Sequence, residues 1–222
     1  MSTSTATVDR YLETIYCIAG EGEVVRPSRL AYWLAVSPPT VSDALRRLAR
    51  DGWITISKDR SVALTSAGHD VAAKLVRRHR VLERWLTDVL GFDWAAADEE
   101  ADRLSSAISD AVIDRIDASM GSPTTCPHGN AIPGRTASYG SLIALSQLSA
   151  GTVAHVRRIS EVAEHEARAL LEVLAAHTIA EGTEVTVVSP TDGHREVTLS
   201  ITGQQLQLSA EAASLIWVEL AR

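Results

Sequence analysis

The sequence predicts a mainly α-helical protein with a small β part, divided into three successive domains. Two observations carry this prediction. Amphipathic helical periodicity dominates the first half of the chain and is interrupted only by the alternating stretch ITISKDRSVALT at residues 54–65. After about residue 140, short alternating segments follow one another with one helical stretch among them. The expected domains are residues 1–73, 74–140 and 141–222.

The first domain is expected to be a winged helix-turn-helix. Residues 7–20 and 26–36 show helical periodicity, and Ser37 is a natural N-cap for a third helix that starts with two prolines. Residues 54–65 alternate around a Lys-Asp-Arg turn and therefore predict a β-hairpin. The order helix, helix, turn, helix, hairpin is that of the winged helix-turn-helix, in which the third helix enters the major groove of DNA.

Hydroxyl groups and arginines are concentrated on the expected outer face of the third helix and at the wing tip. These groups suit phosphates and base edges. Asp43 is an exception because a carboxylate repels phosphate, although it can accept a hydrogen bond from cytosine N4. A winged helix used for protein contacts is the alternative. The predicted DNA-binding residues are Arg26, Ser37, Pro39, Thr40, Ser42, Asp43, Arg46, Arg47, Arg50, Lys58 and Arg60.

Charge is unevenly distributed along the chain, whose formal net charge is −7. Residues 1–80 hold 12 Lys and Arg against 8 Asp and Glu, whereas residues 81–222 hold 9 against 20. A basic front and an acidic rear suit a polyanion-binding head on a body with another role. A chance distribution of charge is the alternative.

The second and third domains are predicted from longer helices and then from strands. Residues 66–90 and 95–119 are expected to form two long helices that suit a dimerisation layer. The loop 121–134 holds three prolines and three glycines and indicates the next boundary. Beyond it, strands and a helix capped by Ser160 predict a small β-barrel with one inserted helix, because closing a sheet removes its exposed edges.

Several classes of protein are not expected from this sequence. It contains no run of eighteen apolar residues, and its N-terminus lacks the basic and apolar regions of a secretory signal. Cys17 and Cys126 are the only cysteines, so no disulfide framework is expected and a cytoplasmic location is the default. No catalytic constellation converges, so the sequence does not predict an enzyme.

The helix expected at residues 66–90 contains an inward-facing carboxylate. His79 and Glu83 are four residues apart and belong to the apolar stripe that includes Leu82 and Leu86. A buried glutamate needs a partner. The residues alone leave three alternatives, which are a metal ion, an ion pair, and a carboxylate at the edge of a core.

Long motifs in this chain resemble the DtxR/MntR family of metal-dependent transcriptional repressors, and the match covers nearly the whole chain. The resemblance implies a homodimer that binds palindromic double-stranded operator DNA when loaded with Fe(II) or Mn(II), and that controls metal uptake and storage. It also implies that the third domain is SH3-like (FeoA-like). The most specific motifs are YLETIY (11–16), SPPTVSDALRRLARDG (37–52), LTSAG (64–68), RRHRVLERWL (77–86) and SPTTCPHGNAIPG (122–134).

The resemblance implies two metal-binding ligand sets, of which the ancillary set is partly kept. His79 and Glu83 match its ligands on the first long helix, and Asp98 stands where the family has a histidine. The third domain can add a carboxylate, for which Glu166, beside His165, is the best candidate. Such a set is a mixed nitrogen and oxygen site for Mn, Fe, Co or Zn. The alternative is that Glu83 pairs with an arginine and His79 is a hydrogen-bonded interior residue.

The other ligand set, the primary site, departs from the family pattern. Asp102, Ser105 and Ser106 replace the ligands of the second long helix. The first-helix ligand falls on Arg10, which cannot bind a metal because it stays protonated, whereas Glu13 fits a position that manganese-type members use. Two hypotheses follow. An Arg10–Asp102 salt bridge replaces the metal and holds a DNA-competent pose, or the site has decayed and Arg10 is solvated.

The residues and the resemblance together favour a dimeric DNA-binding regulator, a repressor that responds to a divalent metal. The first alternative is the same regulator without metal control, with the Arg10–Asp102 bridge in place of the metal. The second is a metal-binding or protein-interaction module that no longer binds DNA. The stretch Cys126-Pro127-His128 is interpreted as a structural part of its loop, because the loop is usual in the family without being a ligand set.

Overall fold

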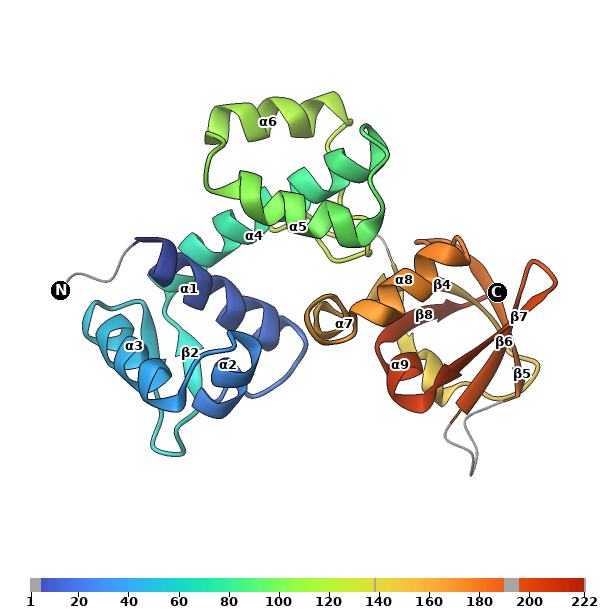
Figure 1. The fold of residues 1–222 in the computed structure, drawn as a ribbon, viewed down its shortest axis with the longest axis horizontal. Coiled ribbons are helices and arrows are strands. Elements are labelled where there is room, and N and C mark those ends of the chain that lie inside the picture. Colours follow the sequence, from blue (N-terminus) through green and yellow to red (C-terminus); the bar gives the residue numbers. More distant parts are fainter. Residues whose placement is uncertain (1–4, 138, 190–195, 222) are drawn as a thin grey trace.

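A computed structural model describes residues 5–137, 139–189 and 196–221 of the chain. Its three hydrophobic cores correspond to a winged helix-turn-helix head, a helical layer and a third domain built on an antiparallel sheet (Figure 1), which confirms the predicted fold class. The side chain of His165 lies outside the described residues. Among the described helices, none combines the length and the hydropathy needed to span a membrane.

The head has the order of elements that the sequence predicts. Its elements are α1 (Thr5–Gly20), α2 (Pro27–Trp33), α3 (Pro38–Arg50), β1 (Ile54–Ile56) and β2 (Val62–Leu64). Side chains at helical spacing form its core and include Leu12, Ile15, Leu30, Val41 and Leu45. Because α3 buries only this stripe, its opposite face remains available on the side of the head away from the third domain (Figure 1).

A capping residue joins the hairpin to the long helix α4 (Ser66–Asp88). The N–H of Gly68 donates a hydrogen bond to the hydroxyl oxygen of Thr65 (3.1 Å), and this hydroxyl donates to the carbonyl oxygen of Gly52 (2.8 Å). A Cβ atom at position 68 would lie 2.0 Å from the carbonyl oxygen of Trp53. Glycine is therefore required where α4 passes the end of the hairpin.

Replacing Thr65 with alanine is expected to lower the free energy of unfolding by about 1–2 kcal/mol, because both cap hydrogen bonds are lost. Urea denaturation of the purified protein measures this change. Ser66→Ala is the matched control, since Ser66 is exposed in the first turn of the same helix. Equal stability of the two variants would contradict the role of the cap.

The helical layer contains one more break than the sequence predicts. It consists of α4, α5 (Trp94–Ser105) and α6 (Asp110–Ser119). The prediction of a single helix over residues 95–119 is wrong, because the chain leaves the helix at Ser106 and Ser109 becomes the N-cap residue of α6. Serine hydroxyls compete for backbone groups, and the Ser105 hydroxyl donates to the carbonyl oxygen of Asp102 (3.0 Å).

The third domain is a six-stranded antiparallel sheet with the strand order β3-β8-β4-β5-β6-β7. Its elements are β3 (Ile143–Ala144), the 3-10 turn η1 (Leu145–Gln147), β4 (Val153–Ile159), α7 (Glu161–Glu166), α8 (Arg168–Ala176), β5 (Glu184–Ser189), β6 (Glu196–Ile201), β7 (Gln204–Ser209), α9 (Ala210–Ser214) and β8 (Ile216–Leu220). Ser160 caps α7 as predicted, but the inserted helix is divided in two at Ala167. The short helix α9 precedes β8, because Ser209 accepts a hydrogen bond from the N–H of Ala212 (3.0 Å) and starts a helix there.

A buried carboxylate directly after α1 joins the head to the third domain. The side chain of Glu21 is 6% exposed and pairs with Arg158 of β4. It also accepts hydrogen bonds from the Ser160 hydroxyl (2.9 Å) and from the backbone N–H of Glu161 (2.9 Å). Four groups from two domains therefore meet at one point, at the junction of β4 and α7.

Candidate functional site

The candidate nucleic-acid interface is the outer face of α3 together with the wing. Ser37 caps α3 by accepting a hydrogen bond from the N–H of Thr40 (3.4 Å), with Pro38 and Pro39 in the first turn. Most of the predicted DNA-binding side chains are exposed, and Ser42 is half-buried. The exposed ones are Arg26, Ser37, Pro39, Thr40, Asp43, Arg46, Arg47, Arg50, Lys58 and Arg60.

Two acidic side chains in this interface are paired with arginines. Asp43, which the sequence marks as unfavourable for phosphate, forms an ion pair with Arg46 one turn further along α3. At the wing, the guanidinium of Arg26 donates to the carbonyl oxygen of Asp59 (2.9 Å) and lies 3.7 Å from its carboxylate. The local repulsion expected from Asp43 is therefore reduced, and the surface retains its arginines for a polyanion.

The candidate metal centre begins with His79, held between two aspartates on α5. Its Nε2 atom lies 3.2 Å from Asp98 Oδ1, and its Nδ1 atom lies 3.2 Å from Asp102 Oδ1. Burial lowers the pKa of His79, but the contacts with Asp102 and Asp98 and the charge of Glu83 outweigh it and raise that pKa well above its ordinary value. The raised pKa favours the protonated imidazole, and a cation that binds this side chain competes with that proton.

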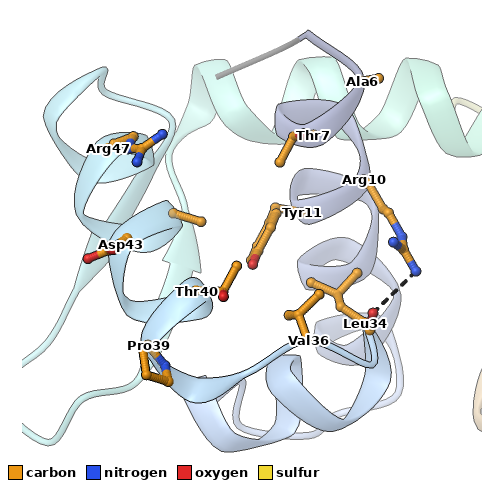
Figure 2. Close-up of a pocket in the computed structure, with 11 residues that line it drawn as sticks. Ala6, Thr7, Arg10, Tyr11, Leu34, Val36, Pro39, Thr40, Asp43 and Arg47 are labelled. Carbon is orange, nitrogen blue, oxygen red and sulfur yellow. Dashed lines mark hydrogen bonds between the residues drawn. The ribbon is translucent and has the colours of Figure 1, made fainter. Parts of the chain in front are cut away.

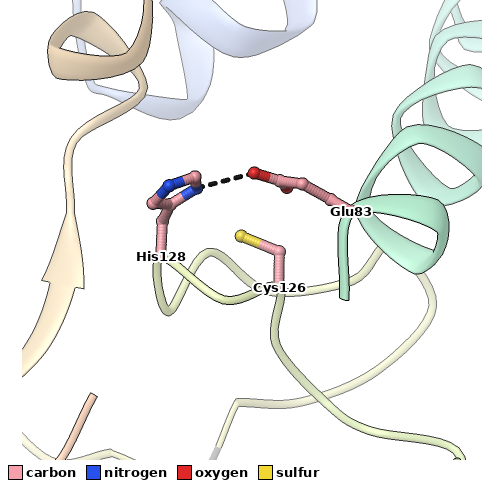
Figure 3. Close-up of side chains that lie close together, drawn as sticks. All are labelled: Glu83, Cys126 and His128. Carbon is pink, nitrogen blue, oxygen red and sulfur yellow. Dashed lines mark ion pairs between the residues drawn. The ribbon is translucent and has the colours of Figure 1, made fainter. Parts of the chain in front are cut away.

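Glu83, one turn further along α4, faces a second pair of possible ligands from the loop before the third domain. Its carboxylate lies 2.7 Å from His128 Nδ1, with Cys126 beside both (Figure 3). The ligand atoms of these three side chains all lie within 4.8 Å of one another, and all three residues are buried. Within the described residues, neither Glu83 oxygen accepts a hydrogen bond of acceptable geometry. A buried carboxylate without hydrogen bonds suits a cation.

The loop that carries Cys126 and His128 is held in place from both sides. Arg84 of α4 donates to the carbonyl oxygen of Cys126 (3.1 Å), and the indole of Trp94 meets the His128 ring edge-on at 4.9 Å. Gly129 has a positive φ of 80°, and a Cβ atom there would lie 1.9 Å from the carbonyl oxygen of Arg157. The two side chains are thus oriented by their surroundings, as ligands must be.

The third domain contributes a carboxylate near this centre, but not the one predicted. Glu166 forms an ion pair with Arg29 of α2, and its position beyond the first turn of α7 turns it toward the head. Glu161, five residues earlier, is buried and pairs with Arg80 of α4. Burial raises the pKa of Glu161, but the charge of Arg80 outweighs this and holds that pKa below its usual value. The prediction of Glu166 as an ancillary ligand is therefore not supported by its contacts.

Among the described residues, no group of possible metal ligands includes the primary-site positions. The predicted Arg10–Asp102 salt bridge is absent between these two described residues, because the Arg10 guanidinium donates to the carbonyl oxygen of Leu34 (3.4 Å) and Asp102 contacts His79. The Ser105 hydroxyl is turned to its own helix. Burial raises the pKa of Glu13, and the charges of Asp102 and Glu161 raise it further. The charges of His79 and Arg80 lower this pKa but do not outweigh the increase.

Part of this centre was expected from the sequence. The predicted residues His79, Glu83 and Asp98 have ligand atoms that lie within 4.8 Å of one another. Cys126 and His128 were interpreted as structural, although both are residue types that bind metals. The available signal was the spacing of a cysteine and a histidine two apart in a glycine- and proline-rich loop. Glu83 belongs to both groups and links them.

The fold and these clusters define a DNA-binding protein with a metal-binding and dimerisation layer and a third domain. Three family descriptions match in this order. They are the N-terminal DNA binding domain of iron dependent repressors (residues 3–62), their metal binding and dimerisation domain (65–134) and the FeoA domain (143–220).

Relatives of known function match over nearly the full length. The chain is 33% identical over 222 residues to the diphtheria toxin repressor of Corynebacterium diphtheriae, covering 96% of each protein. It is 33% identical over 213 residues to the iron-dependent repressor IdeR of Mycobacterium tuberculosis, covering 87% of this chain and 92% of that protein. A manganese-dependent transcriptional repressor in complex with manganese matches with a TM-score of 0.84 at 31% identity, over 96% of this chain and 100% of the other. The chain belongs to the family of iron-dependent repressors, the DtxR/MntR family, whose members are DNA-binding regulators and not enzymes.

Proposed function

We propose that this chain is a homodimeric repressor that binds a palindromic duplex operator when a divalent metal occupies the centre around Glu83. The observation that carries the proposal is the buried Glu83 carboxylate, without hydrogen bonds among the described residues, facing Cys126 and His128 in a chain with a DNA-binding head. DNA selected from a random duplex pool tests the DNA-binding part. Affinity for the selected DNA is expected to fall steeply with salt, and a flat salt response would favour a module that no longer binds DNA.

The ligand types restrict the metal. Glu83, Cys126 and His128 would hold it through one carboxylate, one thiolate and one imidazole, with His79 and Asp98 as the adjoining set. A thiolate beside an imidazole favours Zn(II), Fe(II) or Co(II), and a carboxylate also accepts Mn(II). The metal would supply positive charge that compensates the buried acid and fixes the loop against α4.

Contacts of the chain itself supply a route from the loop to the head. The N–H of Ile159 on β4 donates to the carbonyl oxygen of His128 (2.8 Å), and the Asn130 side chain donates to the carbonyl oxygen of Ile159 (3.0 Å). The adjacent Arg158 pairs with Glu21, the residue that follows α1. A loop ordered around Glu83 therefore also orders β4 and, through Glu21, the orientation of the head.

Glu21→Gln is expected to reduce the metal-induced gain in DNA affinity about fivefold or more, because the charged contact between β4 and the residue that follows α1 is lost. The measurement is operator affinity by fluorescence anisotropy, with and without metal. Glu100→Gln on α5 is the control, since Glu100 pairs only with Arg103 of its own helix among the described ion pairs. If metal increases the operator affinity of Glu21→Gln as much as that of the wild type, Glu21 does not connect the loop to the head.

Exposed apolar side chains on the helical layer support the homodimer. Val89, Leu90 and Phe92 at the end of α4 and Val112 on α6 are 57%, 50%, 38% and 45% exposed. Such side chains suit burial against a second copy of the chain, and a two-fold dimer matches a palindromic site. Sedimentation of the full-length protein tests this state.

A regulator without metal control is the second candidate. It is favoured by the primary-site positions, where Arg10 and Ser105 make contacts of their own and present no ligand set. Arg10 contacts Leu34 and Asp102 contacts His79 among the described residues, so the Arg10–Asp102 bridge adds no support to this candidate. Equal operator affinity in chelator and in metal would favour it.

A further inference from the structure

The head contains a cavity of about 580 Å³ between α1 and α3, distinct from the metal centre (Figure 2). This volume lies within the range of about 300–1,000 Å³ that is usual for small-molecule sites. Its walls are mainly apolar, with polar side chains on the two helices. The lining residues that matter for recognition are Arg10, Tyr11, Val36, Thr40, Ala44 and Arg47.

A buried hydroxyl group points into this cavity. Tyr11 is 4% exposed, and its ring extends from α1 toward α3 in Figure 2. Its hydroxyl has no hydrogen-bond partner among the described residues. Burial raises the pKa of Tyr11, and the charge of Arg10 lowers it by a smaller amount. The phenol therefore remains protonated and can donate a hydrogen bond. An unpartnered buried donor is costly unless a ligand or water accepts its hydrogen bond.

The charge of the lining is positive. Arg10 lies on the α1 side and Arg47 on the α3 side (Figure 2). The one acidic lining residue, Asp43, forms an ion pair with Arg46, which reduces its effect on the cavity. Apolar walls, two guanidinium groups and one phenol donor together match a ligand with an apolar body and a carboxylate.

We propose that the cavity between α1 and α3 binds a small amphipathic carboxylic acid, with its apolar body against Val36 and Ala44 and its carboxylate on the side of Arg47 and the Tyr11 hydroxyl. The ligand site does not depend on the proposed function. One consequence does rest on it: α3 supplies Pro39, Thr40 and Arg47 to the lining, so an occupied cavity changes operator affinity.

The test uses 2-naphthoate as the probe and the neutral 2-naphthamide as its matched analogue, each titrated calorimetrically into the full-length protein without DNA. Saturable binding of naphthoate at one per chain is expected, with a dissociation constant of about 0.01–1 mM. The amide is expected to bind about tenfold more weakly or worse, because it cannot pair with the arginines.

Two variants locate the binding. Tyr11→Phe removes only the hydroxyl and is expected to weaken naphthoate binding about fivefold to tenfold. Val36→Trp fills the cavity and is expected to abolish binding. Tyr32→Phe is the control, because Tyr32 is 67% exposed on α2 and lies outside the cavity lining. If Val36→Trp does not fold, the affinity of Tyr11→Phe for naphthoate alone tests where the ligand binds.

The proposal is overturned if naphthoate shows no saturable binding, if acid and amide bind equally, or if neither Tyr11→Phe nor Val36→Trp weakens binding. A second titration, of operator DNA in the presence of saturating naphthoate, addresses the consequence. If naphthoate binds in the calorimeter but operator affinity does not change, the ligand site is supported and its effect on DNA binding is contradicted. Failure of the ligand site and failure of its effect on DNA binding therefore give different results.

Discussion

Glu83→Gln is expected to remove nearly all of the stabilisation that a divalent metal gives to this protein. With free metal at about 100 times its dissociation constant, the wild-type protein should gain about 2.7 kcal/mol in its free energy of unfolding. The variant should gain less than about 0.5 kcal/mol, because a neutral amide replaces the carboxylate shared by the two ligand groups. Denaturation followed in chelator and in Zn(II), Mn(II), Co(II) or anaerobic Fe(II) measures the difference.

The design separates ligand loss from a general loss of stability. Glu100→Gln makes the same chemical change on a partly exposed carboxylate of α5 and should keep the full metal-dependent gain. Cys126→Ser should weaken the response most for Zn(II), since a thiolate ligand is lost. A metal-dependent gain in Glu83→Gln equal to that of the wild type would contradict the assignment of this centre.

The double substitution Arg47→Ala/Arg50→Ala is expected to lower operator affinity about 10²- to 10⁴-fold, since each arginine that contacts a base or phosphate contributes about 1–3 kcal/mol. Both side chains are exposed on α3 outside its buried stripe, and Arg47 also lines the cavity between α1 and α3. The free energy of unfolding should therefore change little. Affinity for the selected operator, measured over a range of salt concentrations, should also show a smaller salt dependence.

A charge-matched control tests whether position matters. Arg103→Ala/Arg168→Ala removes two exposed arginines from α5 and α8, outside the head. This variant should bind the operator within about twofold of the wild type, because distant exposed charges are screened. Similar losses in both double variants would indicate a general effect of net charge and would contradict the assignment of α3 as the recognition helix.

Local patterns in the sequence predicted most of the head. Ser37 followed by two prolines fixes the start of α3, and the alternation around Lys58 produces the hairpin, because both depend on neighbouring residues. The break between α5 and α6 was not predicted, since the periodic apolar positions continue through residues 106–109 and hide it. Hydrogen bonds from serine side chains to the backbone determine that boundary. The preference of serine for helix ends is a weak signal beside the periodic apolar residues.

The candidate metal centre was harder to predict because its parts are far apart in the sequence. Spacing on one helix identified His79 and Glu83. The approach of Cys126 and His128 to Glu83 depends on how the loop packs between α4 and β4, which no local pattern states. The position of Glu161 beside Arg80 could not be predicted from the sequence for a related reason. These residues lie at opposite ends of α7, and the docking of α7 on the head decides which one faces α4.

Operator affinity of the full-length protein in chelator and in metal tests the central claim most directly. The claim is that a metal held by Glu83, Cys126 and His128 controls DNA binding. The expected result is that metal tightens binding of the wild type at least about tenfold, a coupling within the usual allosteric range, and that Glu83→Gln shows no such gain. Equally tight, sequence-specific binding by the wild type in chelator would contradict the claim and favour the metal-independent regulator.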